Sequence, residues 1–230
     1  MGSLGDLGGM LSLLLDGFAV TVAVFVLTLV FSIPLGFLVA KGRMSKIKIV
    51  SGLVRFYISI MRGTPLMLQL LLVYFGPYYL FKIPLRNLNI ETLGGTLDYR
   101  YVATIIGFSL NYAAYFAEIF RGGIQSMPIG QYEAAQILGF SKTQTFFRII
   151  LPQVIKRVLP ACTNEIITLV KDTSLAQVIA VGEMFFVAKG LSSTMVSIMP
   201  LAAAGVFYYV FNWVIERLMN AAEKKLNYYQ

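Results

Sequence analysis

Five apolar stretches, each long enough to cross a lipid bilayer, constrain this chain of 230 residues more than any other feature. A transmembrane α-helix needs about 20 predominantly apolar residues and satisfies all of its backbone hydrogen bonds internally. Charged residues make up 13% of the chain, against about 25% in an average soluble domain, so a soluble globular surface is excluded. The stretches cover approximately residues 10–40, 49–81, 101–120, 151–170 and 196–218.

The expected fold is therefore an all-α integral membrane protein with five transmembrane helices, forming a single domain over residues 1–230. The second stretch is interrupted by the polar run at residues 62–65, Arg-Gly-Thr-Pro. A further apolar stretch at 176–188 is too short to span, and we expect it to form one re-entrant or interfacial helix.

Basic residues predict the orientation of these helices, because cytoplasmic loops carry an excess of Lys and Arg. Segment 41–48 contains four basic residues and no acidic one, and the segment after the third stretch and the C-terminal tail are also basic. The opposite loops carry mixed charges. The N-terminus is therefore expected outside and the C-terminus inside. We attribute the net charge of +8 to loops that face anionic membrane lipid, and not to binding of nucleic acid.

Missing residue types exclude several kinds of chemistry. The chain has no His, and Cys162 is its single cysteine, so His-based catalysis, a disulfide framework and a Cys-based metal cluster are excluded. We find no spacing of nucleophile and base that would indicate an intramembrane enzyme. A Gly-x-x-x-x-Gly-Lys-Ser/Thr phosphate loop is also absent, so any ATP that drives this protein must bind to another polypeptide.

The segment at 121–152 is too polar to span a membrane, yet its pattern is not that of a flexible loop. Pro128 can open a short helix, and Gly139 stands where a left-handed helix cap belongs. Ser141 and Gln144 then form a capping box that opens a second helix. On physical grounds alone, this segment is equally well interpreted as an amphipathic connector on the bilayer or as a docking element for a partner protein.

Seven residues of this segment resemble a family signature. Glu133-Ala134-Ala135, then Gly139 after three residues, and Ile149, Leu151 and Pro152 after nine more, match the EAA signature of the membrane subunits of binding-protein-dependent ABC importers. The resemblance implies a type I ABC importer permease fold with a cytoplasmic coupling helix. In such importers the EAA segment docks into the ATPase subunit, so Glu133, Ala134, Ala135 and Gly139 are the implied coupling residues.

The same resemblance implies partners and a location. Two ATPase subunits, an extracytoplasmic substrate-binding protein and a second permease subunit, either an identical copy or a close paralogue, would assemble with this chain. This chain would hold no cofactor, since ATP and Mg²⁺ would bind to the ATPase partner. The expected location is the bacterial cytoplasmic membrane, as a multi-pass protein in contact with lipid.

Three further segments resemble the polar-amino-acid branch of these permeases. They are FYISIMRGTPLMLQL at 56–70, YAAYFAEIFRGG at 112–123 and NEIITLVKDTSL at 164–175. The resemblance implies an importer for polar amino acids of the arginine, histidine or glutamine type. The main alternative is an ion-coupled secondary amino-acid transporter, which would use carboxylates inside the membrane for coupling. Its usual inverted repeats are not found in this sequence.

Polar residues inside the apolar stretches are the candidate substrate contacts, because such groups are costly in a membrane unless they face a cavity or a partner. A carboxylate at Glu165 beside the amide of Asn164 suits a cationic substrate group, although Glu165 could instead pair with an internal Arg or Lys such as Arg62. The other candidates are residues on one helical face and a residue at the helix break: Asn111, Tyr115 and Thr64.

Overall fold

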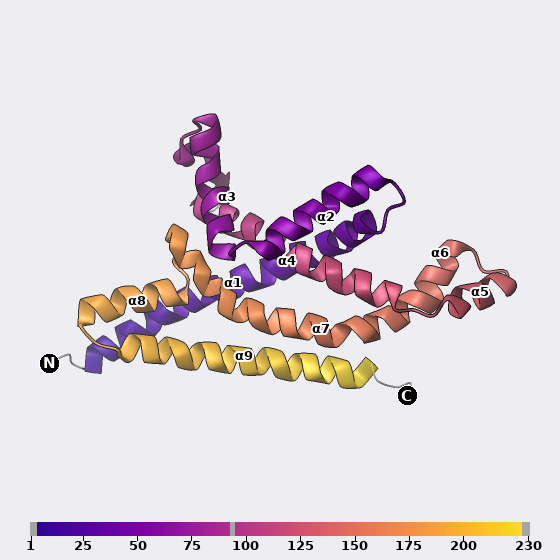
Figure 1. Ribbon diagram of the computed structural model, residues 1–230. Helices are drawn as coiled ribbons and strands as arrows, with labels where there is room; N and C mark the ends of the chain where they lie inside the picture. The colour runs from indigo at the N-terminus through magenta and orange to yellow at the C-terminus, as the bar shows by residue number, and fades with distance from the viewer. Residues whose placement is uncertain (1–3, 93–94, 227–230) are drawn as a thin grey trace.

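The computed structural model describes residues 4–92 and 95–226, and helices make up most of this part of the chain (Figure 1). The α-helices are α1 (Leu4–Arg43), α2 (Lys48–Gly63), α3 (Leu66–Phe81), α4 (Tyr99–Gln125), α5 (Ile129–Ile137), α6 (Lys142–Gln144), α7 (Leu151–Asp172), α8 (Met184–Met195) and α9 (Met199–Leu226). Two short 3₁₀ segments, η1 (Leu85–Leu88) and η3 (Thr173–Ile179), and the π-helical η2 (Thr145–Ile150) complete the helical elements.

A two-stranded antiparallel hairpin is a small addition to the expected all-α fold. Strands β1 (Ile90–Thr92) and β2 (Gly95–Leu97) pair with Ile90 opposite Leu97 between α3 and α4. In β1 the β-branched residues Ile90 and Thr92 stand on either side of the polar Glu91, an alternation that favours a strand. Gly95 has a φ of +133°, a conformation that glycine adopts most readily.

The closest packing joins α1 and α4. In the second half of α1, a small residue occupies every fourth position on the side that faces α4. This lets the two backbones approach closely. A Cβ atom at Gly36 would lie 2.8 Å from Cβ of Phe116 and 3.2 Å from the carbonyl oxygen of Ala113. This stripe of small residues comprises Thr28, Ser32, Gly36 and Ala40.

The other long helices complete the bundle. Large apolar side chains of α4 and α7, among them Phe108, Phe116 and Leu169, form the main core. A second cluster joins the first half of α1 to α8 and α9. There the buried Glu183 caps α8, because its carboxylate accepts hydrogen bonds from the backbone N–H groups of Phe185 and Phe186 at 2.7 Å. The Tyr208 hydroxyl of α9 donates to the same carboxylate at 2.9 Å.

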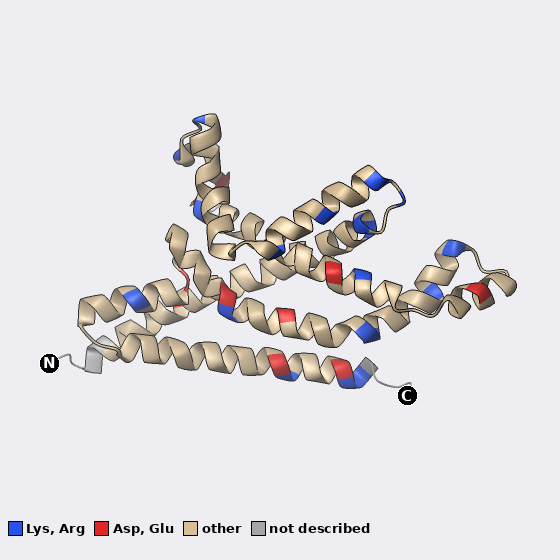
Figure 2. Cartoon of the chain, in the orientation of Figure 1, with Lys and Arg blue, Asp and Glu red and all other residues tan. Residues whose placement is uncertain are grey.

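Two helices, α1 from Leu7 and the whole of α4, are long and apolar enough to cross a membrane by themselves. Two bent pairs reach the same criterion together: α2 with α3, bent by 111°, and the run Lys142–Ile179 with α8, bent by 59°. The first bend confirms the predicted interruption at residues 62–65. Over its described residues, α9 does not reach this criterion of length and apolarity. Its charged residues lie toward its C-terminal end (Figure 2).

The expectation of a single helix over residues 176–188 is wrong. The 3₁₀ segment η3 ends at Ile179, and its C-cap residue Ala180 adopts a left-handed φ of +56°. Helix α8 begins only after Glu183, whose side-chain cap starts a new helix. A left-handed residue followed by a strong N-cap breaks a helix even where the sequence stays apolar.

Candidate substrate pathway and coupling helix

A polar network surrounds the break between α2 and α3. Pro65 has no N–H group to donate, and the 111° bend leaves carbonyl groups at the end of α2 without helical partners. The side-chain amide nitrogen of Gln69 lies within hydrogen-bonding distance of two carbonyl oxygens, Met61 O at 3.0 Å and Thr64 O at 3.1 Å, and of the Thr64 hydroxyl oxygen at 2.8 Å. Specific hydrogen bonds therefore stabilise the break. Arg62 and Thr64 are exposed at its surface.

Asn111 supports this break from α4. Its amide nitrogen donates to Met61 O and to Gln69 Oε1, both at 2.9 Å, and only 4% of the residue is exposed. The sequence placed Asn111 among the candidate substrate contacts. The structure buries Asn111 against the break, and its amide nitrogen already donates to two acceptors of the protein.

Three of the polar residues singled out in the sequence come together beside the break. The guanidinium carbon of Arg62 lies 5.1 Å from the ring centroid of the half-buried Tyr115, which is a cation–π contact. The positive charge of Arg62 also acts through space on the half-buried carboxylate of Glu165 in α7. Within residues 4–92 and 95–226, however, no basic nitrogen lies within 4.0 Å of that carboxylate.

The neighbouring face of α7 is polar and open. Asn164 and Thr168 are exposed, and the Thr168 hydroxyl donates to the Asn164 carbonyl at 2.9 Å. Further along the helix, the Tyr112 hydroxyl of α4 donates to Asp172 at 2.7 Å. Sequence reasoning missed Tyr112, although a buried tyrosine hydroxyl needs a polar partner.

Two charged residues at the start of α4 connect it to the turn after η3. The Asp98 carboxylate caps α4 through the Arg100 N–H at 2.8 Å and pairs with the Arg100 guanidinium at 2.6 Å. These hydrogen bonds hold the pKa of Asp98 below its usual value. Arg100 also donates to the carbonyl oxygen of Ala180 at 2.9 Å, so one side chain joins the two segments.

Near the opposite end of α4, Glu118 is a structural ion-pair residue. It accepts from Arg121 at 2.6 Å and lies 3.8 Å from Arg43 at the end of α1. Glu118 is therefore paired within the chain, by Arg121 of its own helix.

The EAA segment forms the expected helix, turn and second helix. Helix α5 begins one residue after Pro128, and Gly139 adopts a φ of +80° where a left-handed cap was predicted. The Ser141–Gln144 capping box is present with both of its hydrogen bonds. Figure 1 shows α5 and α6 together at one extremity of the molecule.

The two alanines of the signature face in different directions. Ala135 is 2% exposed and packs on its own chain, whereas Ala134 and Glu133 are exposed. Gln131 binds this helix to the base of α7 by accepting a hydrogen bond from Gln153 at 3.0 Å. Sequence reasoning missed the large apolar residues that α5 and its C-terminal cap leave uncovered, which are Ile129, Ile137 and Leu138, at 73%, 86% and 73% exposure.

Comparison with known proteins identifies the family. Residues 32–228 match the family described as "Binding-protein-dependent transport system inner membrane component". The chain belongs to this family. Its members are permease subunits of ABC importers and not enzymes.

Curated relatives support this membership over most of their length. The arginine transport system permease protein ArtQ of Bacillus subtilis is 35% identical over 214 residues, which cover 93% of this chain and 92% of ArtQ. The nopaline transport system permease protein NocM of Agrobacterium fabrum is 39% identical over 207 residues, which cover 87% of this chain and 84% of NocM. This permease is therefore similar to amino-acid ABC transport permeases.

Solved structures agree with the fold of this permease. A crystal structure of an amino acid ABC transporter with histidines has a chain that matches with a TM-score of 0.82 and 28% identity, covering 98% of this chain and 99% of that one. An inward-facing MetNI methionine ABC transporter matches with a TM-score of 0.68 at 17% identity, which supports the fold alone.

Proposed function

We propose that this permease forms half of a pathway for polar amino acids with a cationic side chain, driven by ATP hydrolysis on separate subunits. The observation that carries the proposal is Glu165, a half-buried carboxylate on the open face of α7 with Arg62 acting on it only through space. A carboxylate inside a membrane needs a positive partner, and a substrate guanidinium or ammonium group would supply one.

The proposed substrate contacts are Glu165, Asn164, Tyr115 and Thr64. Each of them is exposed or half-buried, and they lie on α7, on α4 and at the α2–α3 break. Asn111 would act indirectly, by keeping the break in shape. Names of relatives do not decide the substrate, because they specify arginine and nopaline but also L-cystine and glutamine.

We further propose five membrane crossings in one domain, with the N-terminus outside and the C-terminus in the cytoplasm. The crossings would be α1, the α2–α3 pair, α4, α7 and α9. Basic residues at the end of α1 and around α5 and α6 support this orientation (Figure 2). The membrane would be the bacterial cytoplasmic membrane.

Coupling to ATP would pass through α5. Its exposed apolar side chains, with Glu133 and Ala134, form a surface suited to a cleft in an ATPase subunit. ATP and Mg²⁺ would bind to two such subunits, a second permease subunit would complete the pathway, and an extracytoplasmic binding protein would deliver the substrate. Closure of the ATPases would draw the two α5 helices together and turn the pathway outward, and hydrolysis would reverse this motion.

The charge at Glu165 is the direct test of substrate class. Glu165→Gln should reduce uptake of arginine and lysine about ten- to a hundredfold, the usual effect of losing one charge-assisted hydrogen bond, with basal ATPase activity unchanged. Glu216→Gln, on an exposed position of α9, is the matched control. Arginine uptake by Glu165→Gln at the level of the parent would show that Glu165 is structural and would overturn the proposed specificity.

A further inference from the structure

A large apolar cavity of about 620 Å³ lies between four helices. Side chains of α1, α4, α7 and α9, together with Phe147 of η2, line it, and each lining residue is apolar. Phe37, Phe120, Ile155 and Cys162 illustrate the lining. The volume falls within the range of about 300–1,000 Å³ that is typical of ligand pockets.

The cavity lies on a different part of the α7 surface from the exposed amide of Asn164. Cys162 lines it, whereas Asn164 lies on the exposed polar face of the same helix. Two residues along an α-helix correspond to a rotation of about 200°, so these two side chains point in nearly opposite directions. Glu165, three residues after Cys162, is rotated by only about 60° from it and lies at the border between the cavity and the polar face. The wholly apolar lining suits a lipid acyl chain.

Two cationic residues lie close in the sequence to lining residues at one end of this cavity. The rings of Phe37 in α1 and Phe146 in η2 lie 6.4 Å apart, which brings the last turns of α1 next to η2. Lys41 follows Phe37 by one helical turn, and Arg148 follows the lining residue Phe147 directly. Both cations are exposed, and in the part of the chain that the structure describes neither belongs to an ion pair.

We propose that this cavity binds an anionic phospholipid, with an acyl chain between the four helices and the headgroup phosphate between Lys41 and Arg148. An apolar slot that ends in two cations matches the chemistry of such a lipid, since basic pockets between transmembrane helices bind anionic headgroups. The assignment to the cytoplasmic leaflet rests on the orientation given under the proposed function. The binding site itself does not depend on that orientation.

A second copy of this chain fits the cavity less well than a lipid does. The segment at 41–48, which lies at this level, contains four basic residues and no acidic one. Another copy would therefore bring more positive charge toward Lys41 and Arg148, and like charges repel. An anionic headgroup would instead neutralise them.

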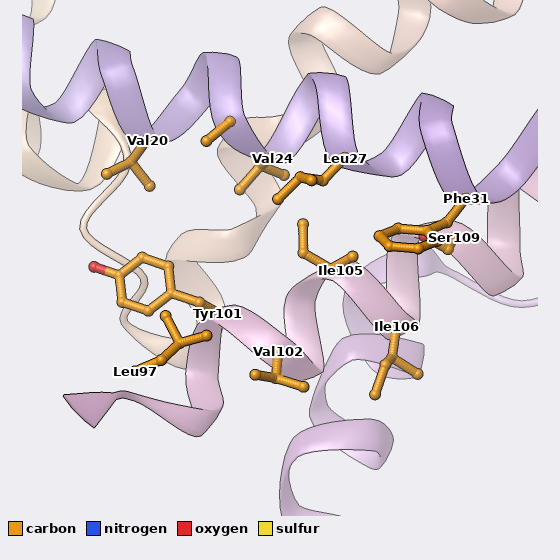
Figure 3. A pocket seen from close by; sticks show the side chains of 11 residues that line it. Val20, Val24, Leu27, Phe31, Leu97, Tyr101, Val102, Ile105, Ile106 and Ser109 are labelled. Atoms are coloured by element: carbon orange, nitrogen blue, oxygen red, sulfur yellow. The ribbon is translucent and has the colours of Figure 1, made fainter. Parts of the chain in front are cut away.

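A comparable cavity in the same chain lacks these cations and provides the control. It measures about 520 Å³ and lies between α1 and α4, lined by residues such as Val24, Tyr101 and Ile106 (Figure 3). Each of its lining residues is uncharged. Ile106 there and Ile155 in the proposed lipid site are equally exposed, at 42% and 43%, so they form a matched pair for substitution.

Photo-crosslinking in the assembled transporter tests this site. Phosphatidylglycerol that carries a diazirine on its acyl chain should crosslink mainly to residues 147–166, and the matching phosphatidylcholine should do so far less. The double variant Lys41→Gln, Arg148→Gln should lower phosphatidylglycerol crosslinking about thirtyfold, as expected for two basic residues near a lipid headgroup. Ile155→Trp should abolish it, whereas Ile106→Trp should leave it unchanged.

Equal crosslinking of the two lipids, or crosslinks that avoid residues 147–166, would overturn the proposal. So would efficient Cys162-to-Cys162 crosslinking between two copies, because a second copy would then occupy the cavity. The parent protein alone decides these outcomes, so they stand even if Ile155→Trp fails to fold. Arginine uptake by Glu165→Gln is a separate measurement that tests the proposed function, and its outcome does not decide the lipid site.

Discussion

The side-chain amides of Asn111 in α4 and Gln69 in α3 are hydrogen bonded at 2.9 Å, 42 residues apart in the chain. Gln69 in turn contacts Thr64 at the helix break, so α4 holds the two arms of the bent pair in one geometry. Because Arg62 and Thr64 extend from that break, the buried amide pair determines where both side chains lie.

Replacing Asn111 by Leu should therefore destabilise the permease. The change would leave Gln69 Oε1 without a donor in a buried site, and the Met61 carbonyl would lose one of its two side-chain donors. We expect a loss of about 1–2 kcal/mol and a lower thermal midpoint in lipid nanodiscs, where single interhelical hydrogen bonds contribute modestly. Asn87→Ala, at an exposed position in η1, is the control and should not shift the midpoint. An unchanged midpoint in Asn111→Leu would show that the pair is dispensable.

The contact between α1 and α4 should tolerate no larger residue at Gly36. A Cβ atom there would meet Cβ of Phe116 at 2.8 Å, so Gly36→Val should force the helices apart and lose about 1–3 kcal/mol of stability. Gly205→Val in α9 has open space around it and provides the comparison. Thermal unfolding followed by circular dichroism measures both variants, and equal midpoints would contradict the close packing.

The turn after α5 should require a residue that accepts a left-handed backbone. Gly139 has open space around its Cα, so its φ of +80° and not a clash restricts substitution. Gly139→Val should strain the turn by about 1–2 kcal/mol or more and reduce substrate-stimulated ATPase activity. Gly139→Asn should retain most of that activity, since Asn visits this conformation. Full activity in Gly139→Val would remove the turn from the coupling mechanism.

The orientation is open to a labelling test with single cysteines in a Cys162→Ser background. Gly130 in α5 and Asn87 in η1 are both exposed positions. A membrane-impermeant maleimide added outside intact cells should label the cysteine at position 87 and spare the one at position 130. The reverse pattern would invert the proposed topology.

Local sequence patterns predicted much of the fold. The break at residues 62–65, the left-handed Gly139 and the Ser141–Gln144 box each depend on neighbouring residues alone, and the structure confirms all three. Residues 176–188 were misread as one helix because apolarity says nothing about where a backbone turns left-handed. The hairpin at 90–97 was missed because three-residue strands give too short a pattern.

The candidate site was harder to predict because it depends on contacts between distant segments. Asn111 was assigned by its position on a helical face, but only the fold shows that Gln69 and Met61 occupy its amide. Tyr112, the partner of Asp172, carried no signal among so many aromatic residues. Whether Thr64, Tyr115, Asn164 and Glu165 contact a substrate stays a prediction.

The energy source of transport tests the central claim most directly. The permease, reconstituted in proteoliposomes with its ATPase, second permease subunit and binding protein, would be assayed for uptake of radiolabelled arginine. We expect uptake that requires Mg²⁺ and ATP on the side of α5 and that persists when ionophores remove every ion gradient. Arginine uptake driven by an imposed ion gradient without ATP would contradict the account and favour a secondary transporter.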